Sequence, residues 1–484
     1  MNEIKHDIGI VCMFGQNYGN QLTYFALYKY VTSLGYSALL IDFPDDCNMA
    51  RNMPIEHQDK FKNWIKTPYP EKDVLVHLPQ KGSLSGQNWL CDMFLLGSDQ
   101  LLRAGFVWDM GFHQCMDWVY SNKYKIAYSA SFGTDIYEGD DRIRAREGFF
   151  LNRFQKISVR EESGIDILKT EFGIDSTLVL DPVFLCDKNE YAGMAESAKN
   201  RLPNEKYSAA YILDPTEERA KMVQHIADSF SSGTAIAISD ACRFQDDGYS
   251  WNFPTLEDVK IEEWISAIYN SDFFITDSFH GVCFALIFRK QFVVVFSKEQ
   301  WRGLARITSI LKMFGLEDRL VESLEELKNR DLFSNQINYE KVGNLIEQKI
   351  TESASWLKGA LEARKNFKIN DTPYDLLLDA KFEVYQNIDS RINEVTKDFR
   401  NNLSCLQEKS SEQVSKLCEQ ISVLQKQNKI SALQKQNEML LLQSKQIDVL
   451  ENRLSKTYNL LINTRHRTFY GACAWLFHKI FKRK

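Results

Sequence analysis

The sequence predicts a body of two α/β lobes, residues 1–180 and 181–350, followed by a long helical segment. Three observations predict this organisation. Short apolar runs alternate with stretches of helical apolar period in two successive series along the first 350 residues. With 484 residues, the chain is too long for a single hydrophobic core. Between residues 386 and 462 there is no proline or glycine, and apolar residues recur at seven-residue steps.

The first series begins with a strand–helix–strand unit. The apolar run 8–13 predicts a buried strand, a helix follows at 21–34 and stops at Gly35, and the next strand lies at 37–43. Further strands are expected at 93–96, 125–130, 156–159 and 177–180, with a helix at 163–172. Strands that alternate with helices in this way are typical of a parallel, doubly wound sheet.

The second series begins near residue 205. Strands are expected at 209–213, 235–239, 273–276 and 292–296, and helices at 216–230, 261–270, 281–288 and 305–314. We place the joint between the lobes near Asp181-Pro182, because proline ends a strand. Each series is expected to have its own core, so the sequence predicts two Rossmann-like lobes that face each other across a cleft.

The segment after residue 350 predicts helices without a sheet. We expect a helical connector at 351–385 and a coiled coil at 386–462. The seven-residue step relates Leu433, Leu440, Ile447, Leu454 and Leu461. The sequence Leu-Gln-Lys-Gln-Asn occurs at 424–428 and again at 433–437, and this offset of nine should interrupt the coiled coil near residue 430. With leucine at d, Asn428 and Asn437 fall at a, which favours a homodimer in register; a single long helix is the alternative.

The tail at 463–484 is basic and rich in aromatic residues, and it contains no acidic residue. Its apolar core is about 13 residues long, which is too short to cross a bilayer. We therefore expect an amphipathic helix that lies in the interface of an anionic membrane. Docking against the protein's own surface is the alternative.

The composition argues against several classes of protein. A net charge of −6 does not suit a nucleic-acid binder that works by overall charge. The ten cysteines show no C-x-x-C pair and no histidine at metal-ligand spacing, so we expect buried thiols in a reducing compartment and no metal site. The first apolar run ends at Gly15, and no stretch reaches the roughly 18 apolar residues of a membrane span. The sequence therefore predicts a cytoplasmic protein.

Polar residues that could do chemistry follow the apolar strand at 273–276. Asp277, Ser278 and His280 come next, and Gly281 opens an apolar helix. Ligands of open α/β sheets bind at the carboxyl ends of strands, and the start of a helix favours an anion. We therefore predict a ligand site here. In the alternative, Asp277 or Ser278 only caps the helix and His280 packs beneath it.

A second basic group follows the strand at 292–296. Lys298, Arg302 and Arg306 are four residues apart, so they would line one face of a turn or helix near the same sheet edge. Their place beyond a strand end favours ligand binding, whereas a solvated basic face is the alternative.

Three loops of the first lobe also follow strands, at 14–20, 97–100 and 158–161. The first lacks the G-x-G-x-x-G spacing, so a dinucleotide site is not predicted. Arg160 comes directly after a buried strand, which is costly unless its guanidinium meets an anion or a carboxylate. Pairing of Arg160 with Glu161 or another acid is the alternative to ligand binding.

Six segments in the same order resemble the polysaccharide pyruvyl transferase family. They are NYGNQLTYFALYKY, GSDQ, SVREESG, LDPVFL, ITDSFHGVCFALIF and RGLARITSILKMFGLEDRL, and they lie between residues 17 and 320. Two departures are seen. Leu101 follows Gln100, where members of the family usually have a tryptophan close by, and the coiled coil and tail lie outside the resemblance.

The resemblance implies a GT-B-like pair of lobes that transfers a pyruvyl group from phosphoenolpyruvate to two hydroxyls of a sugar, as a cyclic ketal. The acceptor would belong to a cell-surface polysaccharide or its precursor. Phosphoenolpyruvate is expected as the donor substrate, with no separate cofactor. Its phosphate and carboxylate need cations, and arginine suits both groups. The candidate substrate-binding residues are Asn17, Tyr18, Gly19, Arg160, Ser278, Lys298, Arg302 and Arg306.

The candidate catalytic residues are Asp99, Asp277 and His280. His280 would either donate to the phosphate as it leaves or act as general acid at the vinyl carbon. Asp99 or Asp277 would lie near the attacking hydroxyl, and a buried carboxylate would stabilise positive charge at the reacting carbon; the acid and the base are not assigned separately. Two other functions use the same fold plan. One is a nucleotide-sugar glycosyltransferase of the GT-B type. The other is a non-catalytic scaffold whose coiled coil gathers surface-glycan enzymes at the membrane.

Overall fold

A computed structural model describes most of the first 380 residues and short stretches beyond them. The described residues are 6–12, 18–42, 75–77, 88–107, 111–231, 233–238, 251–257, 259–296, 303–332, 335–368, 372–380, 397, 404, 408–409, 411–423, 438–439, 441–442 and 445. The chain divides into two compact units, Met1–Asp375 and Leu376–Lys484, which are described separately.

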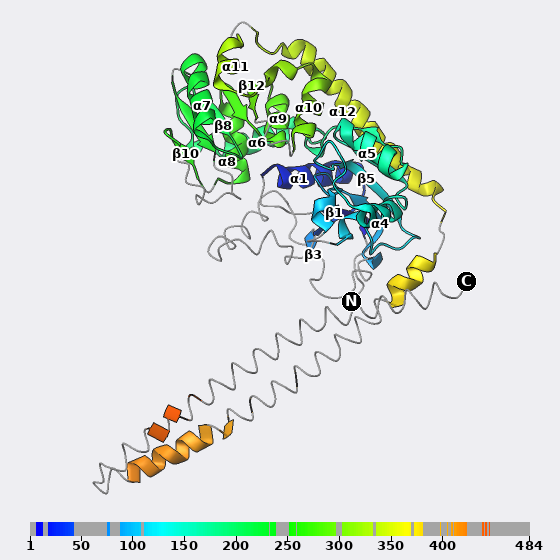
Figure 1. Ribbon diagram of the computed structural model, residues 1–484, viewed down its shortest axis with the longest axis vertical. Coiled ribbons are helices and arrows are strands. Elements are labelled where there is room, and N and C mark those ends of the chain that lie inside the picture. Colours follow the sequence, from blue (N-terminus) through cyan, green and yellow to red (C-terminus); the bar gives the residue numbers. More distant parts are fainter. Residues whose placement is uncertain are drawn as a thin grey trace. The chain divides into compact units, whose positions relative to one another are not determined.

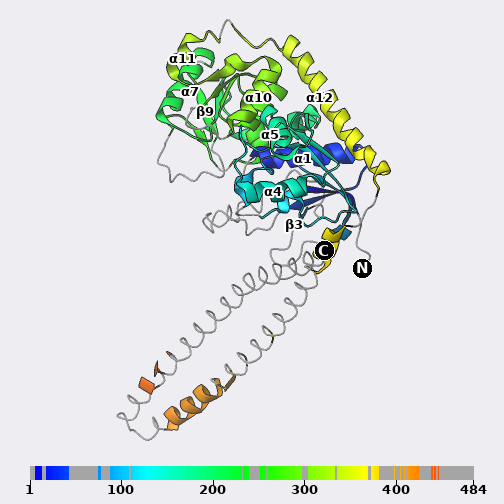
Figure 2. The ribbon, with the colours of Figure 1, turned by 45° about the vertical axis from the view of Figure 1, so that its right-hand side comes forward.

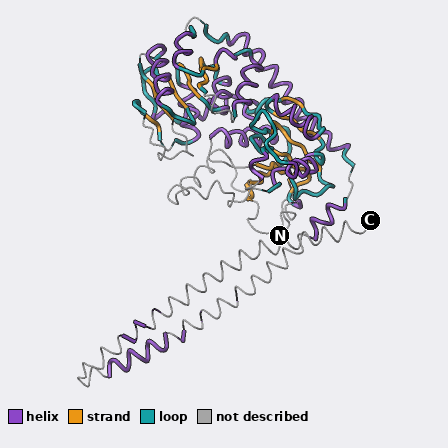
Figure 3. Tube along the Cα trace, in the orientation of Figure 1, coloured by secondary structure: helices purple, strands orange, loops and turns teal. Residues whose placement is uncertain are grey.

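The first unit contains two β-sheets in which all neighbouring strands are parallel (Figures 1 and 3). The seven-stranded sheet of the first lobe has the order β3-β2-β1-β4-β5-β6-β7, and the six-stranded sheet of the second lobe has the order β10-β9-β8-β11-β12-β13. The first consists of β1 (His6–Cys12), β2 (Ala38–Asp42), β3 (Leu75–His77), β4 (Cys91–Leu96), β5 (Tyr124–Ala130), β6 (Lys156–Val159) and β7 (Thr177–Leu178). The second consists of β8 (Ser208–Tyr211), β9 (Ala235–Ile238), β10 (Thr255–Leu256), β11 (Phe273–Thr276), β12 (Gln291–Val295) and β13 (Leu320–Val321).

The helices of this unit lie between the strands and after them. They are α1 (Tyr18–Ser33), α4 (Asp141–Leu151), α5 (Glu162–Phe172), α6 (Lys188–Ser197), α7 (Glu217–Phe230), α8 (Ile261–Asn270), α9 (Phe279–Ile287), α10 (Leu304–Phe314), α11 (Leu324–Asn329) and α12 (Tyr339–Glu362). A short 3₁₀ helix, η4 (Pro182–Phe184), follows β7. The predicted α/β architecture with two parallel sheets is thus confirmed.

The strand order of each sheet reverses at one point, between β1 and β4 in the first lobe and between β8 and β11 in the second. Ligands of open α/β sheets bind beyond the carboxyl ends of strands at such a reversal. The register places Val11 opposite Leu96 in one sheet and Tyr211 opposite Thr276 in the other, at these carboxyl ends. The residues that follow β4 and β11 therefore occupy the positions where this fold favours a ligand site.

All ten predicted strands form, and β6 and β11 have the predicted bounds. The sequence pattern does not predict the edge strands β3, β10 and β13, because runs of two or three residues show no periodicity. It also does not predict α4, α6, α11 and the first half of α12, whereas residues 351–362 of the predicted helical connector lie in the second half of α12. Helix α1 begins at Tyr18 and α9 at Phe279, earlier than expected. The prediction of a loop over 14–20 is therefore wrong for Tyr18, Gly19 and Asn20, which lie in the first turn of α1.

The two lobes share a hydrophobic core. Tyr18, Leu22 and Phe25 of α1 belong to the same cluster of buried residues as Tyr211 and Trp264 of the second lobe. The Tyr18 ring stacks on Trp264 at a centroid distance of 5.7 Å. Each lobe also has a buried cluster of its own, so the shared cluster adds to the predicted separate cores because one face of α1 is buried against the other lobe.

Helix α12 packs against both lobes (Figures 1 and 2). Val342 and Ile346, in its first half, belong to the cluster of the second lobe, whereas Leu357 and Leu361, near its end, pack in a cluster of the first lobe. The Oγ of Ser353 accepts a hydrogen bond from the Leu180 amide at 2.9 Å. The boundary predicted at residue 350 thus falls inside one helix.

The second unit is described only in short helical stretches, the longest of which is 411–423. Most of the predicted coiled coil at 386–462, including Asn428 and Asn437, lies outside the described residues, and so does the tail at 463–484. The coiled coil and the membrane-binding tail therefore stay predictions. Among the described residues, no helix combines the length and the hydropathy needed to cross a membrane. The described free cysteines are buried at Cys12, Cys91, Cys115, Cys186 and Cys283 and exposed at Cys418.

Candidate functional site

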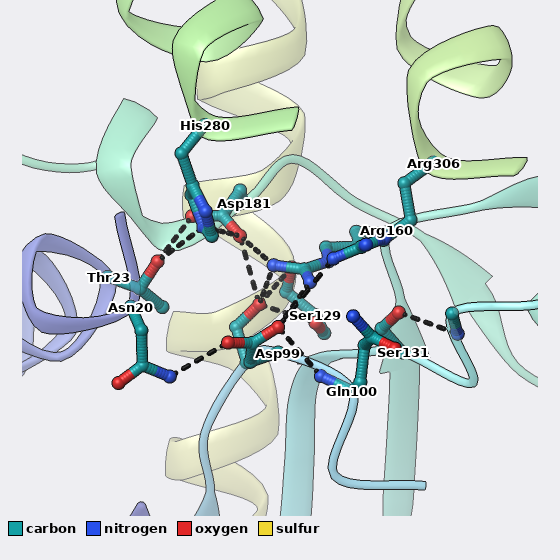
Figure 4. A network of polar contacts seen from close by, with 12 residues as sticks. Asn20, Thr23, Asp99, Gln100, Ser129, Ser131, Arg160, Asp181, His280 and Arg306 are labelled. Atoms are coloured by element: carbon teal, nitrogen blue, oxygen red, sulfur yellow. Dashed lines mark hydrogen bonds and ion pairs between the residues drawn. The ribbon is translucent and has the colours of Figure 1, made fainter. Parts of the chain in front are cut away.

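A group of polar residues from both lobes meets where the carboxyl end of β4 faces the start of α9 (Figure 4). Hydrogen bonds and ion pairs connect six of them, which we call the interlobe network. Its members are Thr23, Ser98, Asp99, Arg160, Asp181 and His280. His280 lies on α9, which follows β11 of the second sheet, whereas Thr23, Ser98, Asp99 and Arg160 come from the first lobe, so the network forms only when the lobes are packed together.

Arg160 follows β6 and lies at the centre of the network, with a fully buried side chain. Its Nη1 donates to Asp181 Oδ2 at 2.6 Å and to Ser98 Oγ at 3.2 Å, and its Nη2 donates to Asp99 Oδ1 at 2.9 Å. Its guanidinium carbon lies 4.6 Å from the centroid of the Phe279 ring of α9. The expected need of this buried arginine for a carboxylate is met by Asp99 and Asp181, not by a hydrogen bond to Glu161.

Asp99 follows β4, and its backbone has a φ of 90°, in the left-handed region that non-glycine residues rarely adopt. Besides Arg160, its carboxylate accepts a hydrogen bond from Asn20 Nδ2 at 2.8 Å. Burial opposes ionisation of Asp99, but the positive charges around it and this hydrogen bond outweigh burial and hold its pKa well below the usual range. A carboxylate of so low a pKa is a weak base, so Asp99 suits charge stabilisation better than proton removal.

Asp181 caps η4 and accepts hydrogen bonds through both carboxylate oxygens. Oδ1 accepts from Thr23 Oγ1 and from the Val183 amide, each at 3.1 Å, and Oδ2 accepts from Arg160 and lies 3.0 Å from Ser98 Oγ. Burial again opposes ionisation. The nearby His280 and Arg160 and the hydrogen bond from the Val183 amide outweigh burial and keep the pKa of Asp181 well below its usual range.

His280 lies in the first turn of α9 and is 5% exposed. Its Nε2 lies 3.0 Å from Thr23 Oγ1 and 3.7 Å from Asp181 Oδ2. The ring packs against the backbone of Gly19, where a Cβ atom would lie 2.2 Å from Nδ1. Gly19 is thus needed to make room for His280. Ser278 caps α9, since its Oγ accepts from the Gly281 amide at 3.3 Å, as the capping alternative predicts.

Arg306 of α10 lies near Asp99, on the side away from Asn20 (Figure 4). Its side chain is 13% exposed. Its Nη1 is 3.7 Å from Asp99 Oδ1, which is too far for a hydrogen bond, and its buried Nε has no partner. Burial and the charge of Arg160 lower the pKa of Arg306 to about 10. Gly303, with a φ of 92°, leaves room for this side chain and donates its amide to Gly133 O of the first lobe. Among the described residues, Arg306 therefore has unused hydrogen-bonding capacity.

Asp277 belongs to a different group of contacts. Its carboxylate accepts from the amides of Leu213 and Asp214 at 2.6 and 3.0 Å and from Arg219 Nη1 at 2.9 Å. These bonds hold the segment between β8 and α7. The structure thus brings His280 to the interlobe network and places the Asp277 carboxylate on the β8–α7 segment, although the two residues are only three apart.

The remaining candidates fall into two classes. Tyr18 is buried in the shared core, where its ring also meets Tyr211 edge-on at 5.9 Å. Asn17, Lys298 and Arg302 lie outside the described residues. The structure therefore brings together Asp99, Arg160, His280 and Arg306, with Gly19 and Ser278 beside His280.

Sequence reasoning missed three members of the network. Thr23 is an ordinary residue of an apolar helix, and Ser98 lies next to the chosen Asp99. Asp181 had a usable signal, because an aspartate directly before a proline after a strand is a candidate cap. In the sequence, this Asp-Pro pair indicates only the joint between the lobes.

The geometry suits a small anion. Arg306 is a largely buried guanidinium without a hydrogen-bonded carboxylate among the described residues, and a buried charge in that state is costly unless an anion meets it. His280 supplies a group that can give or take a proton, and it lies at the start of α9, which favours negative charge. Within the described part of the chain, no cluster of three metal-ligating side chains is found.

Comparison with protein families decides the assignment. The model of the family "Polysaccharide pyruvyl transferase" matches residues 17–297, more than half of the chain. This chain belongs to the polysaccharide pyruvyl transferase family. The matched range contains the whole interlobe network and ends before Arg306. A comparison with curated proteins finds no match.

Solved structures resemble this pyruvyl transferase family member only distantly. ADP-heptose LPS heptosyltransferase II of E. coli is 10% identical with a TM-score of 0.33, over 72% of this chain and 99% of that one. UDP-GlcNAc 2-epimerase of Neisseria meningitidis, bound to UDP-GlcNAc, is 10% identical with a TM-score of 0.43, over 73% and 99%. UDP-N-acetylglucosamine 2-epimerase of Rickettsia bellii is 8% identical with a TM-score of 0.43, over 76% and 100%. Likenesses this weak carry no information about the reaction.

Proposed function

We propose that the protein transfers a pyruvyl group from phosphoenolpyruvate to a pair of sugar hydroxyls in a cell-surface polysaccharide or its precursor, on a GT-B-like pair of lobes. The observation that carries the proposal is the largely buried Arg306 guanidinium, which has no hydrogen-bonded carboxylate among the described residues and lies beside the network that contains His280. Phosphoenolpyruvate carries two anionic groups, and a guanidinium can bind either of them bidentately. Family membership makes this donor the first to test.

The reaction adds one proton to the methylene carbon of phosphoenolpyruvate and forms two C–O bonds at its C2. His280 donates the proton, one sugar hydroxyl adds to C2, phosphate leaves, and the second hydroxyl closes the ketal. The two hydroxyl protons balance the step, since one returns to His280 and the other leaves with phosphate. No separate cofactor is required by this balance.

The residues around His280 have distinct roles in this proposal. Arg306 binds the donor, together with Lys298, Arg302 and Asn17. Arg160 is held by two carboxylates, so it shapes the site and supplies positive charge to the pocket without being free to move. Asp99 stabilises the positive charge that develops at C2, because its low pKa keeps it ionised.

The proposal is tested by donor binding and by product formation. Phosphoenolpyruvate should raise the melting temperature of the full chain, and Arg306→Met should abolish the rise. Substitution of the exposed Arg142 of α4 by Met is the matched control and should leave the rise unchanged. With a suitable glycan acceptor, the wild type should release inorganic phosphate and form an acid-labile ketal. Stabilisation by a sugar nucleotide and not by phosphoenolpyruvate would contradict the proposal and favour a glycosyltransferase.

We also propose that the segment at 386–462 forms a homodimeric coiled coil and that the tail at 463–484 contacts the anionic inner face of the cell membrane. The heptad spacing supports the first proposal, and the basic, aromatic composition supports the second. Flotation with anionic liposomes tests the tail, since its removal should release the protein from the vesicles.

A further inference from the structure

The hydrogen bonds around Thr23 determine which nitrogen of His280 carries a proton. The Thr23 hydroxyl has one hydrogen, and Oγ1 lies near two groups, Asp181 Oδ1 at 3.1 Å and His280 Nε2 at 3.0 Å. An ionised carboxylate can only accept a hydrogen bond. The Thr23 hydrogen therefore goes to Asp181, and the Thr23 oxygen must accept from His280.

The opposite assignment would leave a repulsive contact. If Thr23 donated to Nε2, its oxygen lone pairs would face the Asp181 carboxylate at 3.1 Å without a hydrogen between them. The Arg160 guanidinium and the Val183 amide donate to that carboxylate, hold it in place and favour its ionised form. The arrangement thus favours the form of His280 in which Nε2 bears the hydrogen.

The other ring nitrogen is in a different environment. Nδ1 of His280 has no hydrogen-bond partner among the described residues, and it lies beside Gly19, which has no Cβ to cover it. Gly19 and Thr23 are four residues apart, so they lie on the same face of α1 and contact the ring together. One helix of the first lobe therefore orients a histidine that the second lobe supplies.

We propose that Thr23 and Asp181 are positioning residues that hold His280 with Nε2 protonated, so that Nδ1 is the nitrogen that exchanges a proton with the substrate. This inference rests on the proposed function for the identity of the substrate. In the transfer, Nδ1–H gives its proton to the methylene carbon of phosphoenolpyruvate. The neutral ring that remains has its hydrogen on Nε2, bonded to Thr23, and a hydroxyl proton of the acceptor restores Nδ1–H.

The tautomer can be measured without any substrate. We would label the histidines of the full chain with ¹⁵N and record long-range proton–nitrogen correlation spectra. The His280 signals are assigned by their loss in His280→Gln. Neutral His280 should show a protonated Nε2 and an unprotonated Nδ1. A neutral form protonated at Nδ1 in the wild type would overturn the proposal, even if the protein transfers pyruvyl groups.

Variants of Thr23 separate positioning from folding. Thr23→Val keeps the side-chain shape and removes the hydroxyl, so neutral His280 should become a mixture of tautomers, whereas Thr23→Ser should retain the Nε2–H form. In the transfer assay, Thr23→Val should lower kcat about 10-fold or more with little change in KM for phosphoenolpyruvate, and Thr23→Ser should recover most of the loss. Thermal unfolding checks that both variants are folded.

The outcomes distinguish this inference from the proposed function. Absence of pyruvyl transfer by a wild type that has the Nε2–H form would sink the proposed function and leave the positioning of His280 intact. Pyruvyl transfer with an unchanged His280 tautomer and an unchanged kcat in Thr23→Val would overturn the inference alone.

Discussion

Arg160 Nη1 lies 2.6 Å from Asp181 Oδ2, and both side chains are fully buried. The same guanidinium holds Asp99 through its other terminal nitrogen at 2.9 Å. A buried ion pair of this kind often adds little net stability, but removal of one partner leaves an uncompensated charge in the interior. The network therefore constrains which residues can change without loss of the fold.

Replacement of Arg160 by Met should strongly destabilise the protein, because it leaves the Asp99 and Asp181 carboxylates buried without their main cation. We expect the free energy of unfolding to fall by about 3–5 kcal/mol, measured by urea denaturation. Arg306→Met is the matched control, since Arg306 is also largely buried but has no hydrogen-bonded carboxylate; its stability should be unchanged or higher. Equal losses of unfolding free energy in Arg160→Met and Arg306→Met would contradict the prediction, because the hydrogen-bonded carboxylates would then not account for the stability effect of Arg160.

The sequence predicts much of the fold and only part of the site. Apolar runs such as 273–276 are long and flanked by polar turns, so the strands and their carboxyl ends can be located from periodicity. Position at a strand end then selects Asp99, Arg160 and His280. It cannot tell which of several adjacent side chains enters the site, and for that reason it groups Asp277 with His280, although the Asp277 carboxylate contacts Arg219.

The contribution of α1 is the least predictable feature. Thr23 and Gly19 act through contacts with His280, which lies 257 residues from Thr23 in the sequence. Such pairing depends on how the two lobes pack, and no local pattern encodes it. The same packing buries Tyr18 in a core shared by both lobes, so an aromatic residue that resembles part of a binding loop is a core residue.

Gly19→Ala should impair both stability and transfer, because the new Cβ would lie 2.1 Å from Cγ of His280. The imidazole ring would have to move and lose its bond to Thr23. We expect a loss of about 1–3 kcal/mol in thermal or urea unfolding, with a fall in the rate of pyruvyl transfer. Gly193→Ala in α6 is the control, since a Cβ there meets nothing within 4 Å, and it should raise stability by about 0.5–1 kcal/mol. Normal transfer by Gly19→Ala would contradict the contact with His280.

Glu147 should make stability depend on pH. Burial raises the pKa of this carboxyl from 4.5 to about 7, and Tyr137 donates a hydrogen bond to its Oε2. The folded protein therefore binds this proton more tightly than the unfolded chain does. Between pH 4.5 and about 7 the free energy of unfolding should fall as the pH rises, by about 3 kcal/mol at most, and Glu147 adds no further change above that range.

Glu147→Gln isolates this effect, because the amide oxygen still accepts from Tyr137 but does not titrate. The variant should lack the decline attributed to Glu147 and should be more stable than the wild type above pH 7, as measured by urea denaturation at several pH values. Substitution of the exposed Glu205 by Gln is the control and should leave the pH profile unchanged. A Glu147→Gln profile parallel to that of the wild type would mean that this carboxyl does not titrate abnormally.

The heptad pattern predicts that dimerisation depends on the apolar seam beyond residue 430. Glutamate in place of Leu440 and Ile447 would put charges in that seam, so the double variant should sediment as a monomer where the wild type sediments as a dimer. Gln446→Glu with Asn452→Asp adds the same charge at positions outside the seam and should remain dimeric. Because the interlobe network lies wholly within the first unit, phosphoenolpyruvate should stabilise all three proteins equally. A monomeric wild type would instead support the single long helix, and a loss of the phosphoenolpyruvate effect only in the monomer would show that the second unit contributes to the site.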